Sequence, residues 1–128
     1  MADVTVRRID DMDGMYGGAF KRARASLGVT SFGLAVIDLP PNYDGYPDHT
    51  HEDDGQEEVY FALSGSGEIE VEGERFPLDP QTFVRVGPST RRKVRPGPDG
   101  LRLLALGGVP GGAFVAHPAT EIGGPQRF

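Results

Sequence analysis

The residues best suited to chemistry are two histidines that are separated by a single residue. His49 and His51 flank Thr50 in the segment Tyr-Pro-Asp-His-Thr-His-Glu. Because alternate side chains of an extended chain share a face, both imidazoles are expected to point the same way while Thr50 points the opposite way. Imidazole is a common ligand of divalent metal ions. The pair is therefore predicted to hold one ion.

A carboxylate follows the histidine pair at the start of an apolar segment. Glu58 opens the segment 59–63, whose aromatic and branched residues are typical of a β-strand. If the acidic turn between the two segments reverses the chain, Glu58 returns beside the imidazoles. Gln56 and Tyr60 then share the face of Glu58, and Glu57 does not. This pattern indicates a site built from two imidazoles and one carboxylate.

This segment resembles the first conserved motif of the cupin superfamily, in which a glycine precedes a His-x-His pair, a glutamate follows, and a glycine ends the strand. The spacing from Glu58 to Gly65 fits that motif. Gly45 lies closer to the histidine pair than is usual. The turn is also longer, because six residues separate His51 from Glu58 where about three or four are usual.

The longer turn leaves two interpretations open. In the first, the turn is a tolerated insertion, since loop length costs little free energy. In the second, Gln56 or Glu57 replaces Glu58 as the metal ligand.

Positions 81–92 resemble the second cupin motif, in which a histidine supplies the last metal ligand. Arg92 stands where that histidine is expected, and a shift of one residue would place Arg91 there. The other replaced positions of the motif are Gln81, Gly87 and Ser89. The second motif is therefore degraded, and it offers no fourth ligand.

The resemblance implies a divalent transition metal bound by His49, His51 and Glu58. Two imidazoles and one carboxylate form a facial ligand set that leaves coordination positions open for substrate or oxygen. Iron, manganese, nickel, zinc and copper all fit, and the sequence does not rank them. A pocket without any metal remains the alternative.

Arg92 bears on both the metal and the ligand. A guanidinium stays protonated in a protein and cannot coordinate a metal. At about 6 Å from a divalent ion and an effective dielectric of about 20, it would repel that ion by about 5 kcal/mol. The same group can bind a carboxylate or a phosphate through two parallel hydrogen bonds. We therefore expect a small anionic organic ligand held by Arg92.

Two functions follow from this expectation. The first is a metal-dependent enzyme of dioxygenase, isomerase or lyase type, in which Arg92 anchors the substrate and Glu57, Gln56 or Tyr60 handles protons or orients the substrate. The second is a small-molecule binding module without catalysis. The fold resemblance does not choose a reaction.

Other charged residues have simpler interpretations. His117 precedes Pro118 in an irregular tail and is expected at the surface, with a role as replacement ligand as the alternative. Arg22 and Arg24 are two residues apart and are expected on the solvated face of a strand or loop. The alternative for these arginines is an anion site at the mouth of a barrel.

The 128 residues predict one domain over 1–128. The 19 glycines and 11 prolines, without a long periodic helix pattern, favour an all-β barrel or sandwich. The cupin resemblance covers about 31–106 and narrows this prediction to a double-stranded β-helix, or jelly-roll, barrel.

The elements that must position the site are short strands and turns. The predicted strands are 4–8, 31–39, 58–63, 68–72, 75–78, 82–86, 93–95 and 101–106, with a last short one at 113–116. The predicted turns are 64–67, 72–74 and 96–100.

Charge and hydropathy exclude several classes of partner. The formal charge of -6 and pI near 4.9 argue against a general nucleic-acid binder, which needs a basic face. No apolar stretch has the length of a signal peptide core or a membrane helix, so we expect a cytoplasmic protein without membrane contact. The resemblance also implies a homodimer.

Overall fold

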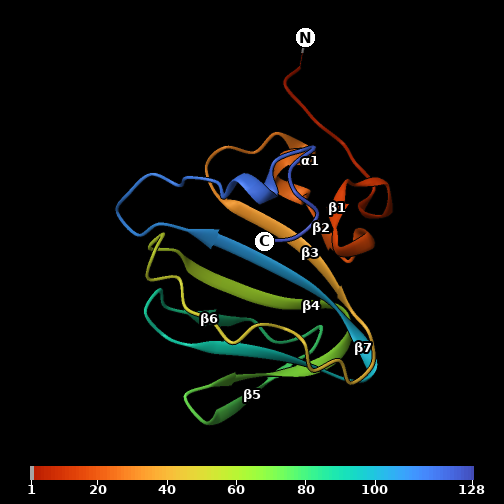
Figure 1. Ribbon diagram of the computed structural model, residues 1–128, viewed down its shortest axis with the longest axis vertical. Helices are drawn as coiled ribbons and strands as arrows, with labels where there is room; N and C mark the ends of the chain where they lie inside the picture. The colour runs from red at the N-terminus through yellow and green to blue at the C-terminus, as the bar shows by residue number, and fades with distance from the viewer. Residues whose placement is uncertain (1) are drawn as a thin grey trace.

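Two long strands, paired antiparallel along their length, form the centre of the fold in the computed structural model, which describes residues 2–128. The strands are β1 (Gly14–Met15), β2 (Phe20–Lys21), β3 (Gly33–Leu39), β4 (Glu57–Val71), β5 (Glu74–Leu78), β6 (Val84–Val86) and β7 (Arg92–Gly108). The central pair is β4 and β7, which lie side by side in Figure 1.

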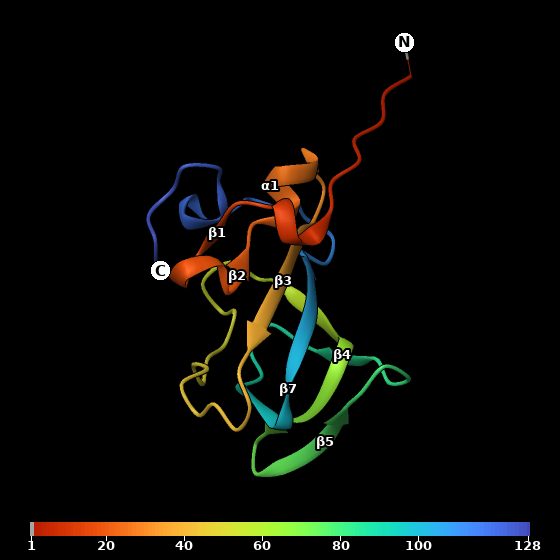
Figure 2. The same ribbon diagram turned by 90° about the vertical axis from the view of Figure 1, so that its right-hand side faces the viewer.

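All strand pairings in the described chain are antiparallel. The strand order is β1-β2-β3-β7-β4-β5, and β6 pairs with the first part of β4. The sheet curls so that β5 lies at the bottom of the molecule in both views (Figures 1 and 2). This arrangement confirms the predicted all-β cupin barrel.

The central strands bend where the sequence analysis predicted that they would end. The turns predicted at 64–67 and 96–100 are wrong, because β4 and β7 continue through both segments with shifts in their register. Gly65 and Gly100 have φ angles of 72° and 78°, and a Cβ at Gly65 would collide with the Gly100 carbonyl oxygen. Glycine thus lets the paired strands bulge and bend without separating.

The core fills the space inside the curled sheet. Burial alternates along β7, where Leu101, Leu103 and Ala105 are buried and the residues between them are half-buried. The core residues that are 0% exposed are Tyr60, Ala62, Ile69, Leu78, Val94 and Leu103. Each large apolar side chain buried in this way contributes about 1.5–3 kcal/mol.

The helices are few and short. They are η1 (Ile9–Asp11), η2 (Tyr16–Gly18), α1 (Ala23–Leu27) and η3 (Pro118–Thr120). Gly28 ends α1 with a φ angle of 76°, a conformation that glycine adopts readily. No helix within residues 2–128 is both long and apolar enough to cross a membrane.

Arg22 connects the N-terminal segment to the C-terminal tail. It is 1% exposed, and its Nε donates to the Ala119 carbonyl oxygen at 2.8 Å. Its Nη2 donates to the Pro125 carbonyl oxygen at 2.5 Å, and its Nη1 pairs with Asp13. The expectation of a solvated face was therefore wrong for Arg22, and so was the alternative of an anion site at the barrel mouth.

Arg24 is also part of this connection. It is 8% exposed, its Nη1 donates to the Val29 carbonyl oxygen at 3.1 Å, and its Nη2 lies 2.7 Å from Glu121 Oε1. Both arginines are buried because the tail covers them, and that contact spans about a hundred residues of sequence.

Two predicted terminal strands do not form. The segment 4–8 is extended but pairs with no strand of the described chain, and it points away from the body of the molecule (Figure 2). The segment 113–116 is irregular.

Candidate metal centre

Backbone hydrogen bonds hold the histidine segment extended at the start of β7. The N–H of His49 donates to the Arg92 carbonyl oxygen at 3.0 Å, and the N–H of Arg92 donates to the His49 carbonyl oxygen at 2.9 Å. The N–H of His51 donates to the Pro88 carbonyl oxygen at 2.8 Å. Both imidazoles consequently lie on one side, with ring centroids 5.0 Å apart.

A tight turn returns the chain so that Glu58 meets the imidazoles. The N–H of Gly55 donates to the His51 carbonyl oxygen at 2.8 Å, and Gly55 has a φ angle of 71°. Glu58 Oε1 then lies 2.8 Å from His51 Nε2 and 3.9 Å from His49 Nε2. One ligand atom from each of these residues lies within 4.8 Å of the other two. The structure thus brings together the three residues predicted as metal ligands.

The tautomers that the surroundings favour suit a metal ion. His49 Nδ1 lies 3.0 Å from the Pro47 carbonyl oxygen, which can only accept a hydrogen bond. His51 Nδ1 lies 3.1 Å from both carboxylate oxygens of Asp54. Each Nδ1 therefore carries a hydrogen, which leaves Nε2 of each ring as the atom that would bind a metal ion. The residues fit a divalent transition metal.

The surroundings shift the pKa values of the two histidines in opposite directions. Burial lowers the pKa of His49 below its ordinary value, so His49 is neutral at pH 7. Burial also opposes the charge on His51, but the hydrogen bonds and charges of Glu58 and Asp54 raise the pKa of His51. Without a metal, His51 can therefore donate from both ring nitrogens to carboxylates.

Glu58 is kept ionised despite its burial. Burial alone would raise the pKa of Glu58, but the hydrogen bonds from His51 and Tyr60 and the charge of Arg92 lower it. The side chain of Glu58 is 13% exposed. A half-buried carboxylate that stays ionised is a suitable metal ligand.

Two tyrosines pack beside the cluster. Tyr60 is 0% exposed, and its hydroxyl donates to Glu58 Oε1 at 2.5 Å. The ring centroid of Tyr46 lies 5.9 Å from that of His49. Burial, together with the charge of Glu58, raises the pKa of both phenols, so both remain neutral hydrogen-bond donors. Tyr46 precedes His49 by three residues in sequence, and that proximity is a usable signal of its place beside the site.

Arg92 points into the barrel and is 0% exposed. Its Nη2 lies 3.9 Å from Glu58 Oε1 and donates to the Gly87 carbonyl oxygen at 3.1 Å. Its Nε and Nη1 have no hydrogen-bond partner within residues 2–128. Arg91 is exposed and donates to the Asp48 carbonyl oxygen at 3.3 Å. Arg92 is thus the arginine beside the cluster.

Two neighbours in sequence lie outside the cluster. The side chain of Glu57 is 39% exposed, and its Oε2 lies 2.8 Å from Arg85 Nε. The side chain of Gln56 donates from Nε2 to Asp54 Oδ2 at 3.1 Å. Neither residue therefore replaces Glu58 in the group of converging ligand atoms.

His117 caps a short helix in the C-terminal tail. Its Nδ1 accepts a hydrogen bond from the N–H of Ala119 at 3.0 Å, at the start of η3. Its ring packs edge-on against Phe128 at 5.2 Å between centroids. The imidazole of His117 is therefore engaged within the C-terminal tail, and it is not among the converging ligand atoms.

Comparison with known proteins assigns the chain to a family. The family model described as Cupin domain matches residues 35–107. A cupin protein from Bacteroides fragilis is 22% identical and superposes with a TM-score of 0.67, over 91% of this chain and 93% of that chain. A comparison with curated proteins finds no match.

Two further solved structures carry names of enzymes. A putative sugar phosphate isomerase from Acidithiobacillus ferrooxidans is 24% identical, with a TM-score of 0.58 over 69% of this chain and 56% of that chain. The DMSP lyase DddQ from Ruegeria pomeroyi is 28% identical, with a TM-score of 0.53 over 61% of this chain and 38% of that chain. The shared fold therefore does not fix one reaction.

Proposed function

The chain belongs to the cupin domain family, and on that premise we propose that it binds one divalent transition metal ion through His49, His51 and Glu58. The observation that carries this proposal is the convergence of three ligand atoms within 4.8 Å, two of them imidazole nitrogens and the third an oxygen of a half-buried carboxylate. When bound, the ion would supply Lewis acidity toward an oxygen atom of a small molecule.

The ligand of this site is a small anionic organic molecule. Support comes from Arg92, which is fully buried and keeps Nε and Nη1 without a hydrogen-bond partner among residues 2–128. A buried guanidinium with unpaired N–H groups is stabilised by a carboxylate or phosphate that accepts from them. Tyr60 orients the site by donating to Glu58, which holds that carboxylate in place.

A second candidate function is a small-molecule binding module that holds no metal. The observation that favours it is the position of Arg92 Nη2, 3.9 Å from Glu58 Oε1. The guanidinium already balances the charge of Glu58 and would repel a divalent ion. In this function the anion binds to Arg92 alone, without turnover.

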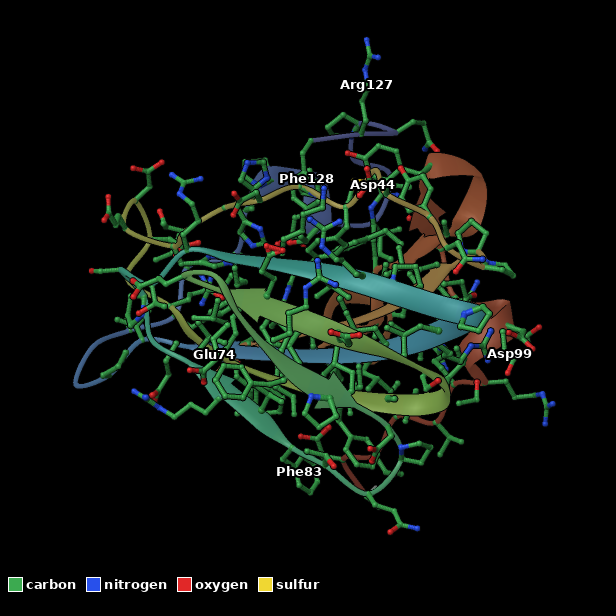
Figure 3. All side chains as sticks on the ribbon, turned by 90° about the horizontal axis from the view of Figure 1, so that it is seen from below. Asp44, Glu74, Phe83, Asp99, Arg127 and Phe128 are labelled. Carbon is green, nitrogen blue, oxygen red and sulfur yellow. The ribbon has the colours of Figure 1, made fainter. Side chains whose placement is uncertain are left out.

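A homodimer is also part of the proposal. The outer face of the barrel supports it, because Phe83 is 70% exposed and stacks on Phe61 with ring centroids 4.5 Å apart. Phe83 lies at the outer edge of the molecule in Figure 3. An exposed aromatic side chain of this kind is typical of a surface that another molecule covers.

The test is the metal content of the protein purified without a histidine tag, measured by inductively coupled plasma mass spectrometry. We expect about one transition metal ion per chain in the wild type. The double variant His49→Ala/His51→Ala, which removes both imidazoles, should retain almost none. Wild-type protein that stays metal-free after reconstitution with iron, manganese, nickel and zinc would support the binding module instead.

A further inference from the structure

The turn between His51 and Glu58 places a second carboxylate behind one of the proposed ligands. The backbone hydrogen bond from Gly55 to His51 closes this turn and folds Asp54 back onto the imidazole of His51. Both carboxylate oxygens of Asp54 lie 3.1 Å from His51 Nδ1. His51 therefore has a carboxylate on each side, Asp54 at Nδ1 and Glu58 at Nε2.

Asp54 is itself held in place. The backbone N–H of Gln56 donates to Asp54 Oδ1 and the side chain Nε2 of Gln56 donates to Asp54 Oδ2, each at 3.1 Å. Gln56 in turn lies against Gly107 of β7, where a Cβ would collide with Gln56 Oε1. A continuous chain of contacts thus runs from the central strand β7 through Gln56 and Asp54 to His51.

The two histidines differ in the group that faces their Nδ1 atoms. His49 Nδ1 faces the neutral carbonyl oxygen of Pro47, whereas His51 Nδ1 faces the charged carboxylate of Asp54. A carboxylate that accepts the Nδ1 hydrogen fixes the ring orientation, keeps the lone pair on Nε2 and makes that nitrogen a stronger donor to a metal. His51 should consequently be the stronger of the two imidazole ligands.

We propose that Asp54 is the positioning residue of the metal centre, acting through His51. This inference rests on the proposed metal function and assigns a purpose to the turn between His51 and Glu58, which contains both Asp54 and Gln56. It also explains why Gln56 is not a ligand: its amide group is engaged in holding Asp54.

The test compares two adjacent acids in the same turn. Asp54→Ala removes the carboxylate at His51 Nδ1, and Asp53→Ala removes an equal charge from an exposed neighbour. Zinc affinity is measured by competition with a chromophoric chelator at constant pH. We expect Asp54→Ala to weaken zinc binding by about 10–100-fold. Asp53→Ala should change it by no more than about threefold, because Asp53 is not the carboxylate that contacts His51 and acts on the site only through a screened charge. Asp54→Asn keeps a hydrogen-bond acceptor but loses the charge. Its zinc affinity should lie between those of Asp54→Ala and Asp53→Ala.

A spectroscopic readout separates positioning from general loss of structure. In the zinc-loaded wild type labelled with nitrogen-15 in histidine, the Nδ1 hydrogen of His51 should give a low-field resonance protected from exchange. Asp54→Ala should abolish that resonance and leave the corresponding resonance of His49 in place. Gln56→Ala removes the side-chain hydrogen bond to Asp54 but keeps its carboxylate, so it should weaken zinc binding to a smaller degree. This variant provides the test if Asp54→Ala folds poorly.

The outcomes distinguish this inference from the proposed function. If the wild type binds zinc and Asp54→Ala binds it as tightly as Asp53→Ala does, the positioning role is wrong while the metal centre stands. If the wild type binds none of iron, manganese, nickel and zinc, both the metal function and the role of Asp54 are overturned.

Discussion

Arg92 is the residue that most distinguishes this site from a centre with four protein ligands. It occupies the place of the expected fourth ligand, is completely buried, and lies 3.9 Å from Glu58. A buried charge of this kind is tolerated only when another charge or hydrogen bond compensates it. Glu58 and the Gly87 carbonyl oxygen supply part of that compensation. We therefore expect Arg92 to weaken the binding of a metal ion and to favour the binding of an anion.

Replacing Arg92 with histidine should strengthen metal binding. Arg92→His removes a positive charge beside the ion and adds an imidazole to the ligand set, so we expect zinc affinity to rise at least about tenfold, or about 1.4 kcal/mol. The matched control is Arg91→His, which makes the same change at the exposed neighbouring position. Both affinities are measured by chelator competition. Equal affinities in the two variants would show that Arg92 does not oppose the metal.

The element that positions the site is the bent pair of β4 and β7. Glu58 lies near the start of β4 and Arg92 at the start of β7, yet Glu58 pairs with Gly107 and Arg92 pairs with Val71. The two residues meet only because both strands bend back over the core. The bend occurs where Gly65 packs on the carbonyl oxygen of Gly100. The geometry of the site thus depends on glycines far from it.

A side chain at the bend should destabilise the fold more than one in an ordinary hairpin. Gly65→Ala combines a positive φ angle of 72° with a collision against Gly100, and we expect it to lower the free energy of unfolding by about 3 kcal/mol or more. Gly73→Ala is the control, because Gly73 has a φ angle of 85° and nothing within 4 Å of its added Cβ. That control should lose about 1–2 kcal/mol. Urea unfolding measures both, and equal losses would contradict the role of the bend.

At the scale of the whole molecule, the outer face of the barrel exposes apolar side chains to solvent. Phe83 is 70% exposed, Leu63 is 36% exposed, and Phe61 stacks beneath Phe83. Covering apolar surface of this kind stabilises an assembly by about 25 cal/mol per Å². A pair of identical subunits would cover the same patch twice.

Placing a charge on this face should prevent the formation of the proposed homodimer. Phe83→Asp buries an unpaired carboxylate in any interface that includes Phe83, so we expect the protein to become monomeric. Val115→Asp is the control, since Val115 is 75% exposed in the C-terminal tail. Light scattering coupled to size-exclusion chromatography gives the mass of each variant. A wild type that is monomeric at high concentration, or a dimer that survives Phe83→Asp, would contradict this prediction.

The sequence by itself determined the features that depend on local pattern. The alternation of His49 and His51, the turn before Glu58 and the positions of most strands follow from residue types a few positions apart. These rules predicted the group of converging ligand atoms and, with the cupin resemblance, the barrel. They failed at the bend of β4 and β7, because a glycine that ends a strand and a glycine that bulges a strand have the same local signature.

The tertiary structure alone decided which polar groups are buried and what they contact. Arg22 is enclosed by the carbonyl oxygens of Ala119 and Pro125, about a hundred residues away in sequence, so no local pattern reveals its burial. The same holds for Arg92, whose distance from Glu58 is set by two bent strands. Asp54 was one acid among several in the sequence, and only the folded turn distinguishes it from Asp53 by directing its carboxylate at His51. Burial and hydrogen bonding are properties of the packed chain, because they arise where segments distant in sequence exclude water together.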